Sequence, residues 1–115
     1  MATEYVAMKD LKFILDEKVE AILSELPENG MQAFDTHDFI RVFMNIAEMS
    51  YADGFVRFKE CKTPFAAFHG CIARYLNTLE KRGLVEKEME DGKKKRVATL
   101  NIKGNKTSNQ VWRKR

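Results

Sequence analysis

The sequence has little of what covalent, metal or redox chemistry needs. Of its 115 residues only two are cysteines, Cys61 and Cys71, and only two are histidines, His37 and His69. Their positions match neither a zinc-ligand nor a thioredoxin-type spacing, and no Ser/His/Asp set or phosphate-binding loop occurs at useful spacing. We therefore expect no metal, no cofactor and no enzyme activity. A buried Cys71 and two ordinary polar histidines are the simpler explanation of these residues.

Long apolar runs are also missing. No segment approaches the roughly 20 consecutive apolar residues of a membrane-spanning helix. The first residues lack the basic and then apolar order of a signal peptide. The sequence therefore predicts a cytoplasmic, reduced protein with no membrane partner.

Acidic residues are absent after position 92, which makes the charge uneven along the chain. The net charge is −6 over residues 1–60, zero over 61–92 and +9 over 93–115, giving +3 for the whole chain. A cationic pole of this kind favours a polyanionic partner such as nucleic acid. A solvated basic tail that only aids solubility explains the same pattern.

Apolar residues recur every three or four positions in three stretches, which is the pattern of amphipathic helices. The first stretch runs from about Glu4 to Leu26 and ends at Pro27. Its apolar face consists of Met8, Leu11, Leu15, Val19, Ile22 and Leu26. Ile14 and Leu23 widen that face, so either the core wraps around this helix or part of it meets a second subunit. A homodimer through this helix is the corresponding prediction.

Asp35 is a good N-cap for a second helix, with Phe34 and Phe39 placed where a hydrophobic staple would have them. The buried face of that helix is predicted to be Phe39, Ile40, Phe43, Met44 and Ala47. Residues 31–34 are a candidate short strand before it. The segment Tyr51-Ala-Asp-Gly54 interrupts the helical pattern.

Thr63-Pro64 predicts the start of a third helix, because Thr caps and Pro suits the first helical position. Gly83 is the expected left-handed residue at its end. The apolar stripe consists of Phe65, Phe68, Ile72, Leu76 and Leu79. The opposite face holds small and polar residues, namely Ala66, Ala67, His69, Gly70, Ala73, Arg74 and Asn77.

This opposite face favours the close approach of another surface. In a DNA major groove, His69, Arg74 and Asn77 would reach base edges or phosphates. The free N–H groups near Thr63 suit a phosphate oxygen. Gly70 inside a helix costs up to about 1 kcal/mol relative to alanine, which also indicates close approach. Another protein helix packing against the small residues would explain the same face.

Asp91-Gly92 is a favoured pair for a two-residue type I′ hairpin turn. The implied register pairs Glu90 with Lys93, Met89 with Lys94, Glu88 with Lys95 and Lys87 with Arg96. Lys87, Lys94 and Arg96 then share one face without an acid, which suits phosphate binding. Lysines also blunt the edges of exposed sheets, and that role alone would explain the run.

From about Met31 to Ile102 the chain resembles bacterial winged-helix regulators of the MarR and PadR kind. The resemblance rests on Leu76-Asn-Thr-Leu-Glu-Lys-Arg-Gly-Leu-Val-Glu-Lys87, on Asp91-Gly92-Lys93 and on Val97-Ala-Thr-Leu-Asn-Ile102. It implies an α+β, mostly α, winged-helix fold with three main helices and a C-terminal β-hairpin wing. The domain is expected to cover residues 1–102, and residues 103–115 to form a basic tail.

The resulting functional prediction is duplex DNA binding, as in a transcriptional regulator, through a recognition helix (about 63–82) and a basic wing (84–102). The candidate DNA-binding residues are Thr63, His69, Gly70, Arg74, Asn77, Lys87, Lys94 and Arg96. The alternative is a winged-helix protein-interaction module without sequence-specific DNA binding. Lys103 to Gln110 are expected to be weakly ordered, whereas Trp112 either docks on the domain or anchors a partner.

Overall fold

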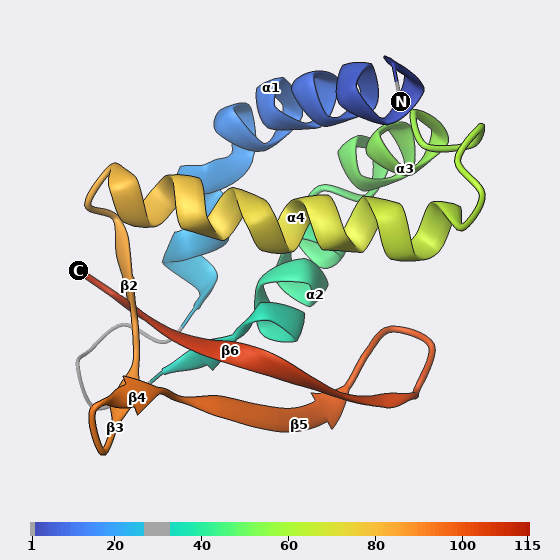
Figure 1. The fold of residues 1–115 in the computed structure, drawn as a ribbon. Helices are drawn as coiled ribbons and strands as arrows, with labels where there is room; N and C mark the ends of the chain where they lie inside the picture. The colour runs from blue at the N-terminus through green and yellow to red at the C-terminus, as the bar shows by residue number, and fades with distance from the viewer. Residues whose placement is uncertain (1, 27–32) are drawn as a thin grey trace.

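The computed structural model describes residues 2–26 and 33–115 and has helices packed on a small antiparallel sheet (Figure 1). Its elements are α1 (Ala2–Glu25), β1 (Phe34–Asp35), α2 (Thr36–Ile46), α3 (Glu48–Val56), α4 (Pro64–Lys81), β2 (Val85–Lys87), β3 (Met89–Glu90), β4 (Lys93–Lys94), β5 (Arg96–Leu100) and β6 (Lys106–Lys114). The predicted α+β, mostly α, class is therefore confirmed. The predicted end of the first helix at Pro27 lies outside the described residues, as do residues 31 and 32 of the candidate strand 31–34, whereas Phe34 begins β1.

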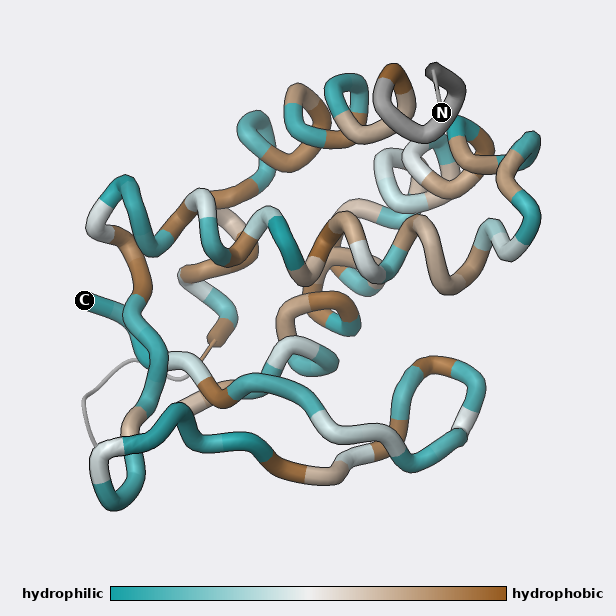
Figure 2. The backbone as a smooth tube through the Cα atoms, viewed as in Figure 1, coloured by the Kyte–Doolittle hydropathy of each residue, from teal (hydrophilic) through white to brown (hydrophobic). Residues whose placement is uncertain are grey.

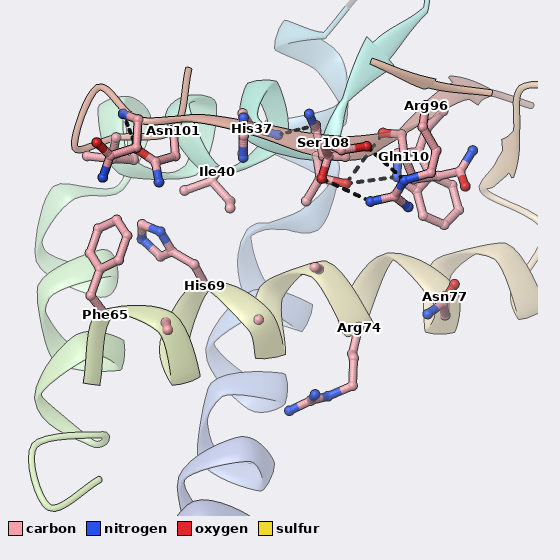
Figure 3. A pocket seen from close by; sticks show the side chains of 18 of the residues that line it. His37, Ile40, Phe65, His69, Arg74, Asn77, Arg96, Asn101, Ser108 and Gln110 are labelled. Atoms are coloured by element: carbon pink, nitrogen blue, oxygen red, sulfur yellow. Dashed lines mark hydrogen bonds between the residues drawn. The ribbon is translucent and has the colours of Figure 1, made fainter. Parts of the chain in front are cut away.

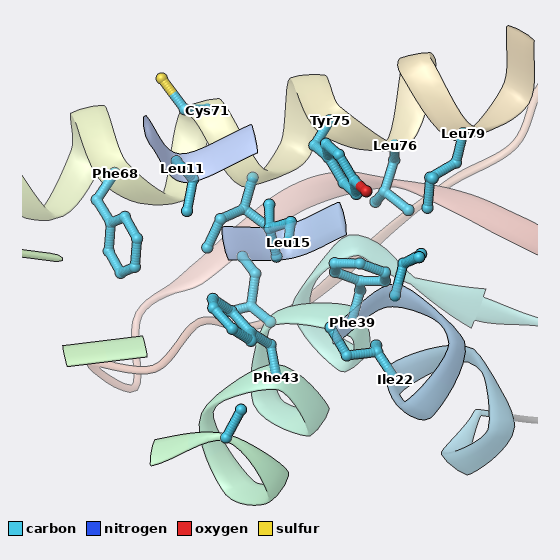
Figure 4. Packing of buried hydrophobic residues seen from close by; sticks show 14 of the residues in the cluster. Leu11, Leu15, Ile22, Phe39, Phe43, Phe68, Cys71, Tyr75, Leu76 and Leu79 are labelled. Atoms are coloured by element: carbon cyan, nitrogen blue, oxygen red, sulfur yellow. The ribbon is translucent and has the colours of Figure 1, made fainter. Parts of the chain in front are cut away.

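The core lies between α1, α2 and α4, where their apolar faces meet (Figure 4). The buried residues are Ala7, Leu11, Leu15, Val19 and Ile22 on α1 and Leu26 just after it. This is the predicted stripe except that Ala7 takes the place of Met8, which is exposed. Ile14 and Leu23 are partly buried and pack against the same core. The core thus wraps around α1 at these two positions, which leaves the predicted homodimer without that argument.

The start of α2 is fixed by the capping that the sequence predicts. The Asp35 carboxylate accepts a hydrogen bond from the backbone N–H of Asp38, and the Asp38 carboxylate accepts one from the N–H of Asp35. Phe34 and Phe39, the predicted staple residues, are both fully buried. This reciprocal cap satisfies donors that a helix start otherwise leaves unpaired.

The prediction that Tyr51 to Gly54 interrupts the helical pattern is wrong, because these residues lie inside α3. Gly54 is buried against α4 and α1, where an added Cβ would lie 3.0 Å from Phe68 Cε1 and 3.2 Å from Leu11 Cδ1. Tertiary packing of this kind outweighs the low helix propensity of glycine. The chain therefore has a further helix beyond the three that the sequence predicts.

The predicted bounds of α4 are confirmed at both ends. Pro64 is its first residue, and Gly83 follows it with a φ of +79°. The Thr63 side chain makes no capping hydrogen bond, contrary to its predicted role; its carbonyl oxygen accepts one from the N–H of Ala67. The buried face includes the predicted stripe residues Phe68, Ile72, Leu76 and Leu79, together with Cys71 and Tyr75.

The C-terminal segment is the centre of the sheet, so the expectation of a weakly ordered tail is wrong. β6 pairs with β1 along one edge, and with β2 and then β5 along the other. Trp112 pairs with both Phe34 and Lys87 and is only 2% exposed. Its indole N–H donates a hydrogen bond to the Thr36 hydroxyl, at 3.2 Å. Of the two alternatives for Trp112, docking on the domain is the one found.

The predicted hairpin register is confirmed only near its turn. Asp91 and Gly92 have φ values of +53° and +76°, and the pairs Met89–Lys94 and Glu90–Lys93 are formed. The Lys95 N–H still donates to the Glu88 carbonyl, but beyond that pair the two halves of the hairpin diverge, and β2 and β5 pair with successive parts of β6. Lys87 consequently faces Trp112, and Arg96 faces Gln110. The predicted pairing of Lys87 with Arg96 is therefore wrong.

Candidate nucleic-acid interface

A groove of about 660 Å³ runs between the outer face of α4 and the sheet, with the start of α2 at its back (Figure 3). On the α4 side it is lined by Phe65, Ala66, His69, Gly70, Ala73, Arg74 and Asn77. On the sheet side it is lined by Lys87, Lys94, Arg96, Asn101, Ile102, Lys103, Asn105, Ser108, Asn109, Gln110 and Trp112. Thr36, His37 and Ile40 complete it. The small-residue face predicted on α4 thus faces an open groove.

The groove is cationic. Its lining includes five Lys or Arg residues, and none of the described residues that line it is an Asp or Glu. In Figure 2 the residues of β4, β5 and β6 are coloured mostly hydrophilic, whereas hydrophilic and hydrophobic residues alternate along the helices. Like charges gathered around a concave surface concentrate their field there, so the groove attracts anions.

Lys87 is not the unpaired cation that the sequence predicts. Its ammonium lies 2.5 Å from Glu80 Oε1 and 4.9 Å from the centroid of the Trp112 ring. The hydrogen bond from Lys87 lowers the pKa of the Glu80 carboxyl below its usual value. The side chain of Lys87 is mostly buried at the edge of the groove, and its ion pair with Glu80 connects β2 to α4.

Lys94 and Arg96 are exposed cations that share one surface, as the sequence predicts. Both line the groove. The Arg96 guanidinium donates to the Ser108 hydroxyl at 3.1 Å and to the Ser108 carbonyl at 2.9 Å. These two bonds fix its direction across β5 and β6 while its charge remains without a carboxylate partner among the described ion pairs.

The other two lysines of the same hairpin, Lys93 and Lys95, lie outside the groove. The carboxylate of Glu88, the predicted partner of Lys95, instead lies 3.5 Å from the Arg113 guanidinium. The hairpin therefore has two sets of cations, as predicted: Lys94 and Arg96 line the groove, and Lys93 and Lys95 do not. The partner of the Glu88 carboxylate differs from the predicted one.

His69, predicted to reach into a DNA groove, is packed among aromatic rings. It is buried, and its Nε2 lies 2.6 Å from the Tyr51 hydroxyl. Burial lowers its pKa to about 4, and the nearby His37 and Lys103 add to the effect. The ring is therefore neutral at pH 7, and it supports the groove wall more than it projects from it.

Of the four remaining predicted DNA-binding residues, three line the groove and one does not. Asn77 and Gly70 line the groove as expected. Arg74 lines it too, but its side chain extends away toward α1 and its Nη2 lies 3.1 Å from Cys71 Sγ (Figure 3). Thr63 is exposed at the start of α4 and is not among the groove residues.

Sequence reasoning missed the loop of residues 101–105 and its lysine. The Lys103 ammonium lies 4.4 Å from the centroid of the Phe65 ring, so the loop reaches across the groove to α4. The Asn101 side chain accepts hydrogen bonds from the N–H groups of Lys103 and Asn105, which holds the loop. The sequence segment Asn101-Ile-Lys-Gly-Asn105 is typical of a turn and could have predicted this loop.

Buried polar contacts hold the back of the groove. His37 Nδ1 lies 2.9 Å from the Thr99 hydroxyl, and its Nε2 lies 3.2 Å from the Thr107 hydroxyl. The Asn109 side chain accepts from the His37 N–H and donates to the Val97 carbonyl and the Thr99 hydroxyl. This network ties α2 to β5 and β6, so the sheet side of the groove is fixed relative to the helices.

Gly70 gives a direct test of whether the groove is open in the free protein. An added Cβ at Gly70 would meet nothing within 4 Å, and alanine is favoured over glycine inside a helix. We expect Gly70→Ala to raise the free energy of unfolding by up to about 1 kcal/mol in urea denaturation. Gly54→Ala, whose Cβ would crowd Phe68, is the contrasting variant and should lower it. A destabilised Gly70→Ala would mean that another side chain fills this space.

Among the described residues no group of three or more His, Cys, Asp or Glu is placed to hold a metal ion. None of the described helices is both long and apolar enough to cross a membrane. No family model, no curated protein and no solved structure matches the chain. The resemblance to MarR and PadR regulators therefore stays a prediction that rests on the sequence motifs.

Proposed function

We propose that the protein is a cytoplasmic winged-helix protein that binds duplex DNA, as transcriptional regulators do. In this proposal α4 is the recognition helix and the segment from β3 to β6 is the wing. Support comes from the order of elements: α4 stops at a glycine, and a strand and a basic hairpin follow at once. The short β1 strand and α2 complete the domain through β6.

The observation that carries the proposal is the cationic groove itself. Lys94, Arg96 and Lys103 line it, the described lining residues include no Asp or Glu, and Asn77 stands across from these cations on α4. Exposed cations grouped without acids are destabilising by themselves, so a polyanion that neutralises them gains affinity by releasing its counterions. Contacts of this kind are to phosphates, and α4 offers few polar side chains for reading bases.

A second candidate function is protein interaction, favoured by apolar side chains outside the groove. Phe13 on α1 is 76% exposed and Met49 on α3 is 81% exposed. The homodimer predicted through α1 belongs to this candidate. Phosphate binding and protein binding differ in their salt dependence, which separates the two functions.

The proposal is tested by titrating the protein with a blunt duplex of random sequence at two salt concentrations, followed by fluorescence anisotropy. We expect log K to fall linearly with log salt, with a slope of about −3 for roughly three phosphate contacts. Binding that is absent at low salt, or unchanged between the two concentrations, would contradict DNA binding. Light scattering on the same samples reports the oligomeric state.

A further inference from the structure

The groove contains an aromatic surface that the proposed duplex binding does not use. Phe65 and His69 rise from α4 side by side, with ring centroids 4.2 Å apart and planes inclined by 55° (Figure 3). Phe65 is half-buried, and the ammonium of Lys103, an exposed residue of the loop, lies over its ring. A flexible lysine can leave an aromatic face at little cost, since an exposed cation–π contact contributes only about 0.5–1 kcal/mol.

The dimensions of the groove select what can enter it. A volume of about 660 Å³ lies within the range of pockets that hold a small organic ligand. A duplex is too large to enter the groove, because its major groove alone is about 12 Å wide. It would reach only the exposed cations Lys94 and Arg96 from outside. A single strand, with one base turned inward and its phosphates along the rim, is compatible with this space.

One end of the groove is aromatic and the other is cationic, which suits the bases and the phosphates of a single strand. Phe65 lies toward one end and Arg96 toward the other, with Asn77 across from the sheet (Figure 3). Single-stranded nucleic acids are held by a cationic groove that follows the backbone and by aromatic side chains on which bases stack. Both components occur here in one groove, whose described lining residues include no Asp or Glu.

We propose that the groove binds an unpaired DNA strand that continues from the duplex, with one base stacked on Phe65 in place of Lys103. Arg96 and Lys94 then meet the phosphates of that strand. This inference rests on the proposed DNA binding and narrows its substrate to duplex DNA with a single-stranded extension. The displaced Lys103 remains close enough to meet a phosphate itself.

Three DNAs test this inference by fluorescence anisotropy at one salt concentration: a blunt duplex, the same duplex with a short thymidine overhang, and the same overhang without bases. We expect the thymidine overhang to tighten binding by roughly tenfold, as a single stacked base does. The overhang without bases should lose most of that gain, because it keeps the phosphates and removes the stacking.

Two variants of Phe65 provide the matched control. Phe65→Leu keeps an apolar side chain and should abolish the gain from the overhang while leaving blunt-duplex binding unchanged. Phe65→Trp should keep the gain. Equal binding of all three DNAs by the native protein would overturn this inference and leave duplex binding standing. A gain that persists in the overhang without bases, or in Phe65→Leu, would also overturn it, whereas binding to none of the three would overturn the proposed function itself.

Discussion

Replacing Trp112 with alanine should lower the free energy of unfolding by about 3–5 kcal/mol, the usual cost of removing a large buried aromatic side chain. Trp112 is 2% exposed and lies in β6 between β1 and β2. The substitution also leaves the Thr36 hydroxyl without its donor. A domain of this size has a total stability of about 5–15 kcal/mol, so the variant should be close to unfolding at room temperature.

Urea denaturation followed by circular dichroism measures this effect. Trp112→Phe is the graded control, because it keeps much of the packing and removes only the hydrogen bond and part of the volume. Lys106→Ala, at an exposed position of the same strand, should change stability very little. If Trp112→Ala were as stable as Lys106→Ala, β6 would not be the centre of the sheet.

Local sequence signals predict most of the helical part of the fold. The N-cap at Asp35, the start at Pro64 and the stop at Gly83 all depend on residues that are close together in the chain, and all three are confirmed. α3 was missed because Gly54 signals a break locally. The signal is overruled by contacts with Leu11 and Phe68, which no local pattern contains.

The sheet was harder to predict because its central strand comes last. The turn at Asp91-Gly92 fixes the nearest pairs of the hairpin, but farther from the turn β2 and β5 pair with β6 instead of with each other, β2 with residues 112–114 and β5 with residues 106–110. Residues 106–110 are all polar or charged, a composition typical of a disordered terminal segment. Asn109 and Gln110 are nevertheless buried, because their side chains form hydrogen bonds with backbone and side-chain groups. Polar residues satisfied in this way carry no hydrophobic pattern.

The candidate site was predicted only in part. The small-residue face of α4 and the cations Lys94 and Arg96 follow from helical and hairpin periodicity, and all of them except Ala67 line the groove. Lys103 and Phe65 meet across 38 residues of sequence, and their contact depends on the position of β6. The pairing of Lys87 with Glu80 likewise depends on how β2 leaves α4.

The proposed DNA binding should depend strongly on the groove cations. We expect Lys94→Glu combined with Arg96→Glu to weaken duplex binding roughly 50-fold or more at about 0.1 M salt, since each lost phosphate contact removes nearly one power of the salt concentration. The slope of log K against log salt should become shallower by up to about two. Anisotropy titrations measure both quantities, and thermal melting checks that the loss of the Arg96–Ser108 bonds leaves the fold intact.

The matched control for this variant is Lys93→Glu combined with Lys95→Glu, which changes the net charge by the same amount within the same hairpin. Neither of these lysines lines the groove, so a contact at the groove predicts a much smaller loss of affinity. Equal losses in the two double variants would mean that DNA responds only to the total charge of the wing. No loss in either would remove the wing from the interface and leave α4, with its few polar side chains, as the remaining candidate surface.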